Sequence, residues 1–425
     1  MLSRRVKRAD PFRRVARCTT MIHTAATPNA RLRLTFHPHD AVDPALEKPV
    51  RNNISVAVAI GRCLFVASDE GARIERLIAG PDGHYADHRS FALTDFFDLP
   101  AGPEGEADVE GLAVDDGWLW VVGSHSLARR KPKPQEHSGD ECLKRLTEVK
   151  REANRCLLGR IPLAAIGDGV FDPVRRHEGR LAACVKMGRK RNALAKALKG
   201  DEHIGRFVHI PAKENGLDIE GIAVRGNRVF LGLRGPVLRG WACILDLRIA
   251  GSGSGRLKLR TPDGKAPAYR KRFIDLDGLG IRELTFDGDD LLILAGPTMD
   301  LDGPAHVWRW SGCLDADSST IVPRDRLTRV LDVPFGTGFD HAEGIAWLPG
   351  GTGDPERRLI VVYDNPGDDR LHPNGTGVDA DIFAIAADAS HRRTVSERND
   401  GLRGEGCVRE IGTAGSIDAQ GGRTE

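Results

Sequence analysis

The sequence has few aromatic residues and no cysteine pattern that marks a disulfide framework or a zinc module. Phe, Trp and Tyr together make up 5% of the 425 residues. The eight cysteines lie far apart, with no C-x-x-C pair and no Cys/His cluster at zinc spacing. We interpret them as reduced thiols of the core or the surface, so we expect a fold held together by packing.

The sequence also lacks an excess of charge of one sign and a long apolar run. The 62 basic and 60 acidic residues leave a formal net charge of +2, which gives no overall field to attract nucleic acid. No stretch reaches the run of about 18 apolar residues that a membrane-spanning helix needs. We therefore expect no membrane association.

The first 20 residues are rich in arginine but lack the apolar segment of a secretory signal. We therefore expect a cytoplasmic protein. We interpret residues 1–30 as a disordered basic extension that precedes the fold, with Met21 as an alternative start to Met1. A basic arm for nucleic acid is the other interpretation of this segment.

Glycine and proline are abundant, with 49 and 24 residues, which is typical of many short strands joined by turns. One pattern occurs five times, at residues 54–68, 110–124, 220–234, 282–296 and 343–364. Each copy has two apolar runs separated by a polar turn such as Asp115-Asp116-Gly117. Because glycine and asparagine accept the positive φ angles of tight turns, each copy predicts a β-hairpin.

Further apolar runs follow the hairpins, which predicts four antiparallel strands in each unit. Radial repetition of such units is typical of an all-β fold, the β-propeller. The interval between the second and third hairpins could hold a sixth blade, but insertions at about residues 127–153 and 190–216 fill it better. We therefore expect five blades, with six as the alternative, and a loop and helix insertion over one face.

The propeller is expected to span residues 31–387. Residues 31–36 would supply the last strand of the last blade and close the ring with the N-terminal part of the chain. Residues 388–425 are poor in apolar side chains and rich in Arg, Gly and Asp, which predicts a disordered tail.

Charged residues recur where the predicted inner strands begin, and hairpin geometry brings these positions to one mouth of the channel. The strand starts and their neighbours carry Glu110, Glu220, Arg282, Glu343, Asp108, Asp218 and His341, and the ends of the second strands add His125, Arg234 and Asn365. Glutamates that face one narrow channel repel one another and need a compensating charge. Arg234 and Arg282 can supply that charge internally, and a divalent cation such as Ca²⁺, which prefers oxygen ligands, can supply it externally.

These residues support two interpretations of the mouth. In the first, a divalent cation is bound by Glu110, Glu220, Glu343, Asp108, Asp218 and Asn365. His125 or His341 would then move a proton, since neutral imidazole can act as a base near pH 7, and Arg234, Arg282 and Lys213 would bind an anionic substrate. In the second, Glu-Gly-Leu/Ile-Ala is a folding signature whose glutamates bind backbone amides or Arg282.

The segments EGLAVDDGWLWVVGSHS, KENGLDIEGIAVRGNRVFLGLRGPVLRGWA, LAGPTMDLDGP and HAEGIA resemble a bacterial family of unknown function, over most of residues 52–385. More distantly, the Glu-Gly-Ile-Ala segments that begin the hairpins are similar to those of the esterase-like phytase family and of calcium-dependent, gluconolactonase-type propellers. This resemblance implies a divalent metal at the channel mouth and hydrolysis of a phosphoester or a lactone. Two of the repeated segments depart from this motif, because Ile54 and Arg282 stand at the position of its glutamate.

We therefore predict an uncharacterised propeller protein that acts as a divalent-metal-dependent hydrolase of phosphoesters or lactones. The alternative is a non-catalytic module that binds a ligand or a protein, since a fold alone does not define a function. The expected partner is a small anionic molecule or a protein at the mouth, and the expected state is a monomer. Nucleic acid is unfavoured, because aromatic residues are not interleaved with the basic ones.

Overall fold

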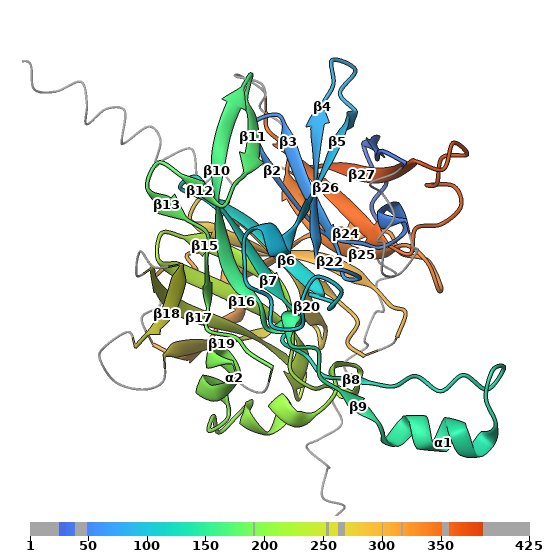
Figure 1. The fold of residues 1–425 in the computed structure, drawn as a ribbon, viewed down its shortest axis with the longest axis vertical. Helices are drawn as coiled ribbons and strands as arrows, with labels where there is room; N and C mark the ends of the chain where they lie inside the picture. The colour runs from blue at the N-terminus through green and yellow to red at the C-terminus, as the bar shows by residue number, and fades with distance from the viewer. Residues whose placement is uncertain are drawn as a thin grey trace, which may run out of the picture. The chain divides into compact units, whose positions relative to one another are not determined.

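The structure, a computed structural model, describes residues 25–38, 49–189, 192–251, 255–261, 268–299, 301–315, 318–350 and 357–385. The chain is an all-β propeller, as the repeat predicts (Figure 1). Most of the predicted basic extension, Met21 and the predicted tail at residues 388–425 lie outside the described residues. No helix in the described ranges is long and apolar enough to cross a membrane.

The main strands form five groups of four, each in the order given by hydrogen-bonded pairing. The first two groups are β2 (Ile54–Ile60), β3 (Cys63–Ser68), β4 (Arg73–Ala79), β5 (Tyr85–Ala92) and β6 (Val109–Asp115), β7 (Trp118–Gly123), β10 (Leu158–Gly167), β14 (Ala183–Val185). The next two are β15 (Asp218–Arg225), β16 (Arg228–Leu238), β17 (Trp241–Gly251), β19 (Tyr269–Asp275) and β20 (Gly280–Asp287), β21 (Asp290–Gly296), β22 (Ala305–Trp310), β24 (Leu327–Val333). The last is β25 (His341–Trp347), β26 (Arg357–Asp364), β27 (Gly377–Ile385) and β1 (Ala30–Thr35).

Shorter elements lie between these strands. They are β11 (Val170–Pro173), β12 (Arg176–His177), β13 (Arg180–Leu181), β18 (Arg256–Arg260), β23 (Thr320–Ile321) and the 3₁₀ turns Val50–Asn52, Leu93–Asp95, Asn154–Cys156, Gly205–His209, Ala212–Glu214 and Arg324–Arg326. Strand β18 pairs with both β14 and β17 and so joins the second and third groups.

The first strand of each group lies on the inside, and these five strands contact one another in a closed ring. β2 contacts β6, β6 contacts β15, β15 contacts β20, β20 contacts β25, and β25 contacts β2. The ring encloses the channel that the repeat predicts. The apolar cores fill the spaces between neighbouring sheets, which explains why β7 and β21 are buried along their whole length.

The N-terminal strand β1 completes the last group. It pairs antiparallel with β27 from Ala30↔Ile382 to Thr35↔Gly377, and Leu34 also pairs with Tyr85 of β5. Leu32 and Leu34 are buried. The prediction that the N-terminal part of the chain supplies this strand is therefore confirmed, and both ends of the propeller sequence share one sheet.

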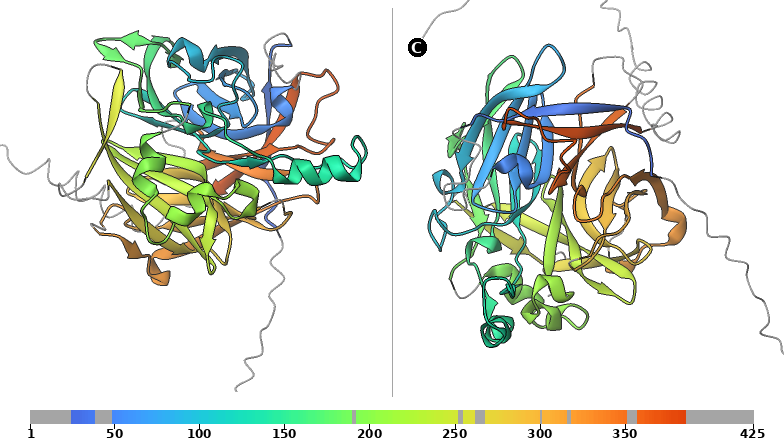
Figure 2. Two further views of the ribbon diagram at one scale, coloured as in Figure 1. Left: turned by 60° about the horizontal axis from the view of Figure 1, so that its bottom comes forward. Right: turned by 90° about the vertical axis from the view of Figure 1, so that its right-hand side faces the viewer.

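The two predicted insertions differ in how they pack. The first forms an arm, in which β8 (Ala128–Arg129) and β9 (Val149–Lys150) carry helix α1 (Gly139–Thr147); the arm projects away from the sheets in both views of Figure 2. The second contains helix α2 (Ala193–Leu198), whose Leu194 and Leu198 are buried in the core.

Candidate functional site

A cavity of about 930 Å³ opens at the mouth of the channel where the inner strands begin. Its wall combines strand starts, strand ends, the base of the arm and the loops that follow β21 and β24. Nearly all of the predicted site residues line it, namely Glu110, Glu220, Glu343, Asp108, Asp218, Asn365, His341, Arg234, Arg282 and Lys213. This volume lies within the range of small-molecule sites.

A β-bulge lies near the start of each inner strand, and the bulged side chains Glu110, Glu220, Arg282 and Glu343 line the cavity. The pairing with the second strand slips by one residue near every inner strand start, at Ser55, Glu110, Glu220 with Gly221, Arg282 and Glu343. A bulge re-aims a side chain and often lies beside a functional site. The sequence alignment placed Ile54 in this ring; the equivalent bulged residue is Ser55, because Ile54 remains in register with Ser68. The Ser55 hydroxyl is buried and donates to the carbonyl oxygen of Val109, so this side chain does not line the cavity.

Two arginines neutralise the acids on one side of the ring. Arg234 contacts Asp218 (Nη2–Oδ2 2.5 Å) and Glu220 (Nη1–Oε1 2.7 Å). Arg282 contacts the other oxygen of Glu220 (Nη1–Oε2 3.0 Å) and also binds Glu343. The internal compensation expected from Arg234 and Arg282 is therefore present at Glu220 and Glu343.

A third arginine, Arg155, was missed by the sequence analysis as a site residue. It lies in the 3₁₀ turn before β10 and contacts Asp108 (Nη1–Oδ2 3.0 Å) and Glu106. The available signal was its position at the start of the predicted third strand of its unit, which returns to the same mouth.

Two acids of the cavity wall, Glu110 and Asp69, lack such compensation from the described residues. Among the described residues, no basic side chain lies within ion-pair distance of Glu110 or Asp69. Burial raises the pKa of both carboxyls well above their usual range, and repulsion from neighbouring acids raises each pKa further. One oxygen of Asp69 is buried without a hydrogen-bond partner. Glu110 and Asp69 therefore have no compensating positive charge at ion-pair distance among the described residues.

Two of the arginine-bound acids also hold their protons more tightly than usual. Burial raises the pKa of Glu343 to about 8 and that of Asp218 to about 7, although Arg282 and Arg234 lower these pKa values in part. The arginines offset the loss of hydration only partly, as expected for buried ion pairs.

The two predicted histidines occupy different places. His341 lines the cavity, and its Nε2 lies 3.0 Å from Oδ1 of Asp302. His125 is buried with its Nε2 3.2 Å from the carbonyl oxygen of Leu157, and it is not among the residues that line the cavity. Burial lowers the pKa of His125 to about 4, so this imidazole is neutral at pH 7.

The residues do not form a metal centre in the arrangement observed. Across the described ranges, no group of three or more His, Cys, Asp or Glu side chains is placed to hold a metal ion. Four of the predicted ligands are contacted by arginine instead, namely Asp108, Asp218, Glu220 and Glu343. Asn365 uses its amide to donate to the carbonyl oxygen of Gly338 at 2.6 Å. The divalent cation stays a prediction from the sequence.

The model of a family described as "Protein of unknown function (DUF3616)" matches residues 53–381, so the chain belongs to this family. Among curated proteins, none matches the sequence.

The chain is also similar in structure to several solved proteins. A tail fibre of Staphylococcus aureus phage P68 is 13% identical with a TM-score of 0.29, over 87% of this chain and 57% of the fibre. Hydrazine synthase of Kuenenia stuttgartiensis is 11% identical with a TM-score of 0.30, over 84% and 67% of the two chains. The PQQ-bound aldose sugar dehydrogenase of Streptomyces coelicolor is 11% identical with a TM-score of 0.34, over 84% and 100%. No activity is transferred from proteins at this level of similarity.

Proposed function

We propose that this member of the DUF3616 family is a binding protein whose cavity takes a small ligand with a positively charged group. The observation that carries the proposal is the uncompensated pair of acids, Glu110 and Asp69, on the cavity wall. A bound cation would supply the charge that Arg155, Arg234 and Arg282 supply to the other acids of the ring.

The charge balance of the inner wall supports a cationic ligand over an anionic one. More carboxylates than basic side chains line the cavity. The carboxylates are Asp69, Glu70, Glu106, Asp108, Glu110, Asp218, Glu220, Asp302, Glu343 and Asp364, and the basic side chains are Arg129, Arg130, Lys131, Arg155, Lys213, Arg234 and Arg282. Of the predicted anion-binding residues Arg234, Arg282 and Lys213, the two arginines are engaged by acids of the cavity. An anionic substrate would have to displace these buried contacts, each of which is costly to break.

An organic cation fits the arrangement better than a divalent metal. A metal ion needs several ligands at one point, and among the described residues no group of three or more His, Cys, Asp or Glu side chains is placed to hold one. An ammonium or guanidinium group needs only a carboxylate at hydrogen-bond distance, which Glu110 or Asp69 can provide. The binding alternative considered from the sequence is therefore favoured over the metal-dependent hydrolase.

Thermal unfolding with added cations tests the proposal. We expect ethylammonium to raise the Tm of the wild-type protein at pH 8, since a ligand at 100 times its Kd adds about 2.7 kcal/mol to the free energy of unfolding. Glu110→Gln should fold normally, because glutamine resembles the protonated acid, but its Tm should no longer respond.

Sodium chloride at equal ionic strength and the exposed variant Glu104→Gln are the controls. An unchanged wild-type Tm, or an equal response of Glu110→Gln, would overturn the proposal. A Glu110-dependent rise that only CaCl₂ produces would also overturn it and would restore the metal-dependent hydrolase.

A further inference from the structure

Apolar side chains surround the acidic part of the cavity. Leu146, Met299, Leu301 and Phe335 all line it, although 42%, 40%, 62% and 45% of each residue is exposed to solvent. Met299 and Leu301 lie in the loop after β21, and Phe335 lies in the loop before β25. Both loops join strand ends at the mouth, so these side chains form an apolar rim outside the ring of bulged residues.

Most of the exposed large apolar side chains lie on the arm and on the two loops that carry the rim, and Leu146, Met299, Leu301 and Phe335 among them line the cavity. Among the described residues, the large apolar side chains that are exposed are Leu143, Leu146, Val149, Ile166, Met299, Leu301, Ile321, Phe335 and Phe339. Only Ile166 and Ile321 of this set lie outside the arm and the two rim loops. Apolar surface that gathers at one cavity of a protein marks an interaction site.

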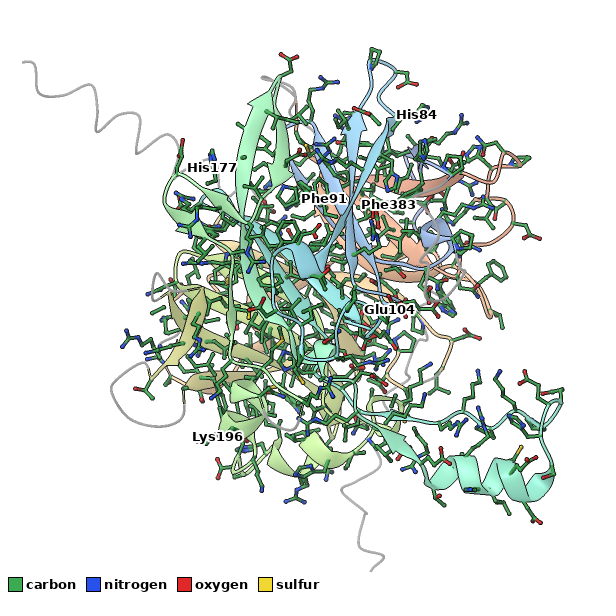
Figure 3. All side chains as sticks on the ribbon, viewed as in Figure 1. His84, Phe91, Glu104, His177, Lys196 and Phe383 are labelled. Carbon is green, nitrogen blue, oxygen red and sulfur yellow. The ribbon has the colours of Figure 1, made fainter. Side chains whose placement is uncertain are left out.

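The arm forms one side of this apolar rim, although its helix is not packed against the sheets. Helix α1 has no buried residue, and its side chains stand apart from those of the sheets in Figure 3. A capping box between Ser138 and Glu141 stabilises its first turn. Leu146, near the end of the helix, lines the cavity.

We propose that the ligand is an amphiphilic cation, a small molecule with a positively charged head and an apolar tail. This inference rests on the proposed function and adds the tail to it. The head would lie between Glu110 and Asp69, and the tail would lie against Met299, Leu301 and Phe335. The charge of the wall matches the head, the apolar rim matches the tail, and a volume of about 930 Å³ suits a small molecule.

A series of alkylammonium ions from ethyl to octyl, below micellar concentrations, tests the tail. Each methylene buried on the rim should lower the Kd by roughly fourfold, because burial of one methylene contributes about 0.8 kcal/mol. Calorimetric titration of the wild-type protein would give this slope.

The variant Leu301→Ser/Phe335→Ser should bind ethylammonium as tightly as the wild type but lose most of the dependence on chain length. Both residues are exposed, so the variant should fold, and Ile321→Ser, at 59% exposure away from the cavity, is the matched control. A wild-type Kd that does not change with chain length, or a slope that survives in the double variant, would overturn the inference. In either case, binding of ethylammonium that depends on Glu110 would leave the proposed function standing. If ethylammonium does not bind in this way, both the proposed function and the present inference are overturned.

Discussion

Glu110 and Glu220 occupy the same position of the same repeat, but their surroundings differ. Glu220 is held by Arg234 and Arg282, whereas no basic side chain among the described residues pairs with Glu110. Arg234 lies in the second strand of its hairpin, β16, and the corresponding residue after Glu110 is Ser124. The hairpin of Glu220 therefore carries a compensating arginine of its own, whereas the hairpin of Glu110 has a serine at the equivalent position.

The raised pKa of Glu343 predicts how stability depends on pH. With a pKa of about 8 in the folded state, Glu343 keeps its proton where the unfolded chain has already lost it. The folded state then binds more protons, so the free energy of unfolding falls as pH rises from about 4.5 to 8. His125 acts in the opposite direction, but only between about pH 4 and 6.5, because its folded pKa is about 4.

We therefore expect the Tm of the wild-type protein to fall between pH 6.5 and 8, and Glu343→Gln to reduce this fall. Asp218, with a pKa of about 7, contributes a part that remains in the variant. Scanning calorimetry in buffers of equal ionic strength measures the effect, and the exposed Glu104→Gln should behave as the wild type. If the Tm of Glu343→Gln falls by the same amount as that of the wild type, the extra proton of the folded state is held by another group.

At the scale of the strands, the glycine of each Glu-Gly pair allows the inner strands to approach closely. A Cβ added to Gly221 would lie 3.0 Å from the Cα of Glu283 on β20, and one added to Gly344 would lie 3.0 Å from the Cα of Val56 on β2. The bulge directs the acid to the mouth, and the glycine behind it leaves room for the next strand. The motif thus has a structural role as well as a chemical one.

Gly221→Ala should lower the free energy of unfolding by about 1–3 kcal/mol, because the methyl group meets the backbone of β20 and overpacks the ring. Gly200→Ala is the matched control, since no atom lies within 4 Å of its added Cβ. Urea unfolding of both variants measures the difference. Equal free energies of unfolding for Gly221→Ala and Gly200→Ala would mean that the ring of inner strands accommodates the methyl group without loss of stability.

For the whole molecule, β1 joins the last group of strands to the first. Leu34 is fully buried and pairs with Val378 of β27 and Tyr85 of β5, residues far apart in the chain. Closure of the ring therefore depends on contacts that form only when the entire propeller is assembled, which makes them slow to form and important for cooperativity.

Leu34→Ala should cost about 2–5 kcal/mol, the usual range for a large apolar side chain removed from a core. Arg33→Ala, the exposed neighbour, should change stability by about 0.5 kcal/mol or less. Chemical unfolding followed by tryptophan fluorescence would compare them. A cost for Leu34→Ala no larger than for Arg33→Ala would exclude a role of β1 in closure.

The sequence by itself determined the hairpins, the all-β propeller, the closing strand and the mouth at which charged residues gather. These follow from alternation of apolar runs and turns, which is a local property of the chain. Only the tertiary structure decided that Ser55 and not Ile54 belongs to the ring, since a bulge depends on the pairing of two strands. It also decided that the ring of His125 contacts the carbonyl oxygen of Leu157. Which acids are paired with Arg155, Arg234 or Arg282, and which have no basic partner among the described residues, was likewise decided only by the tertiary structure. The contacts of Arg282 join neighbouring groups of strands, and the others join separate strands or turns of one group. Their geometry depends on how these elements pack around the channel, which periodicity along one strand does not encode.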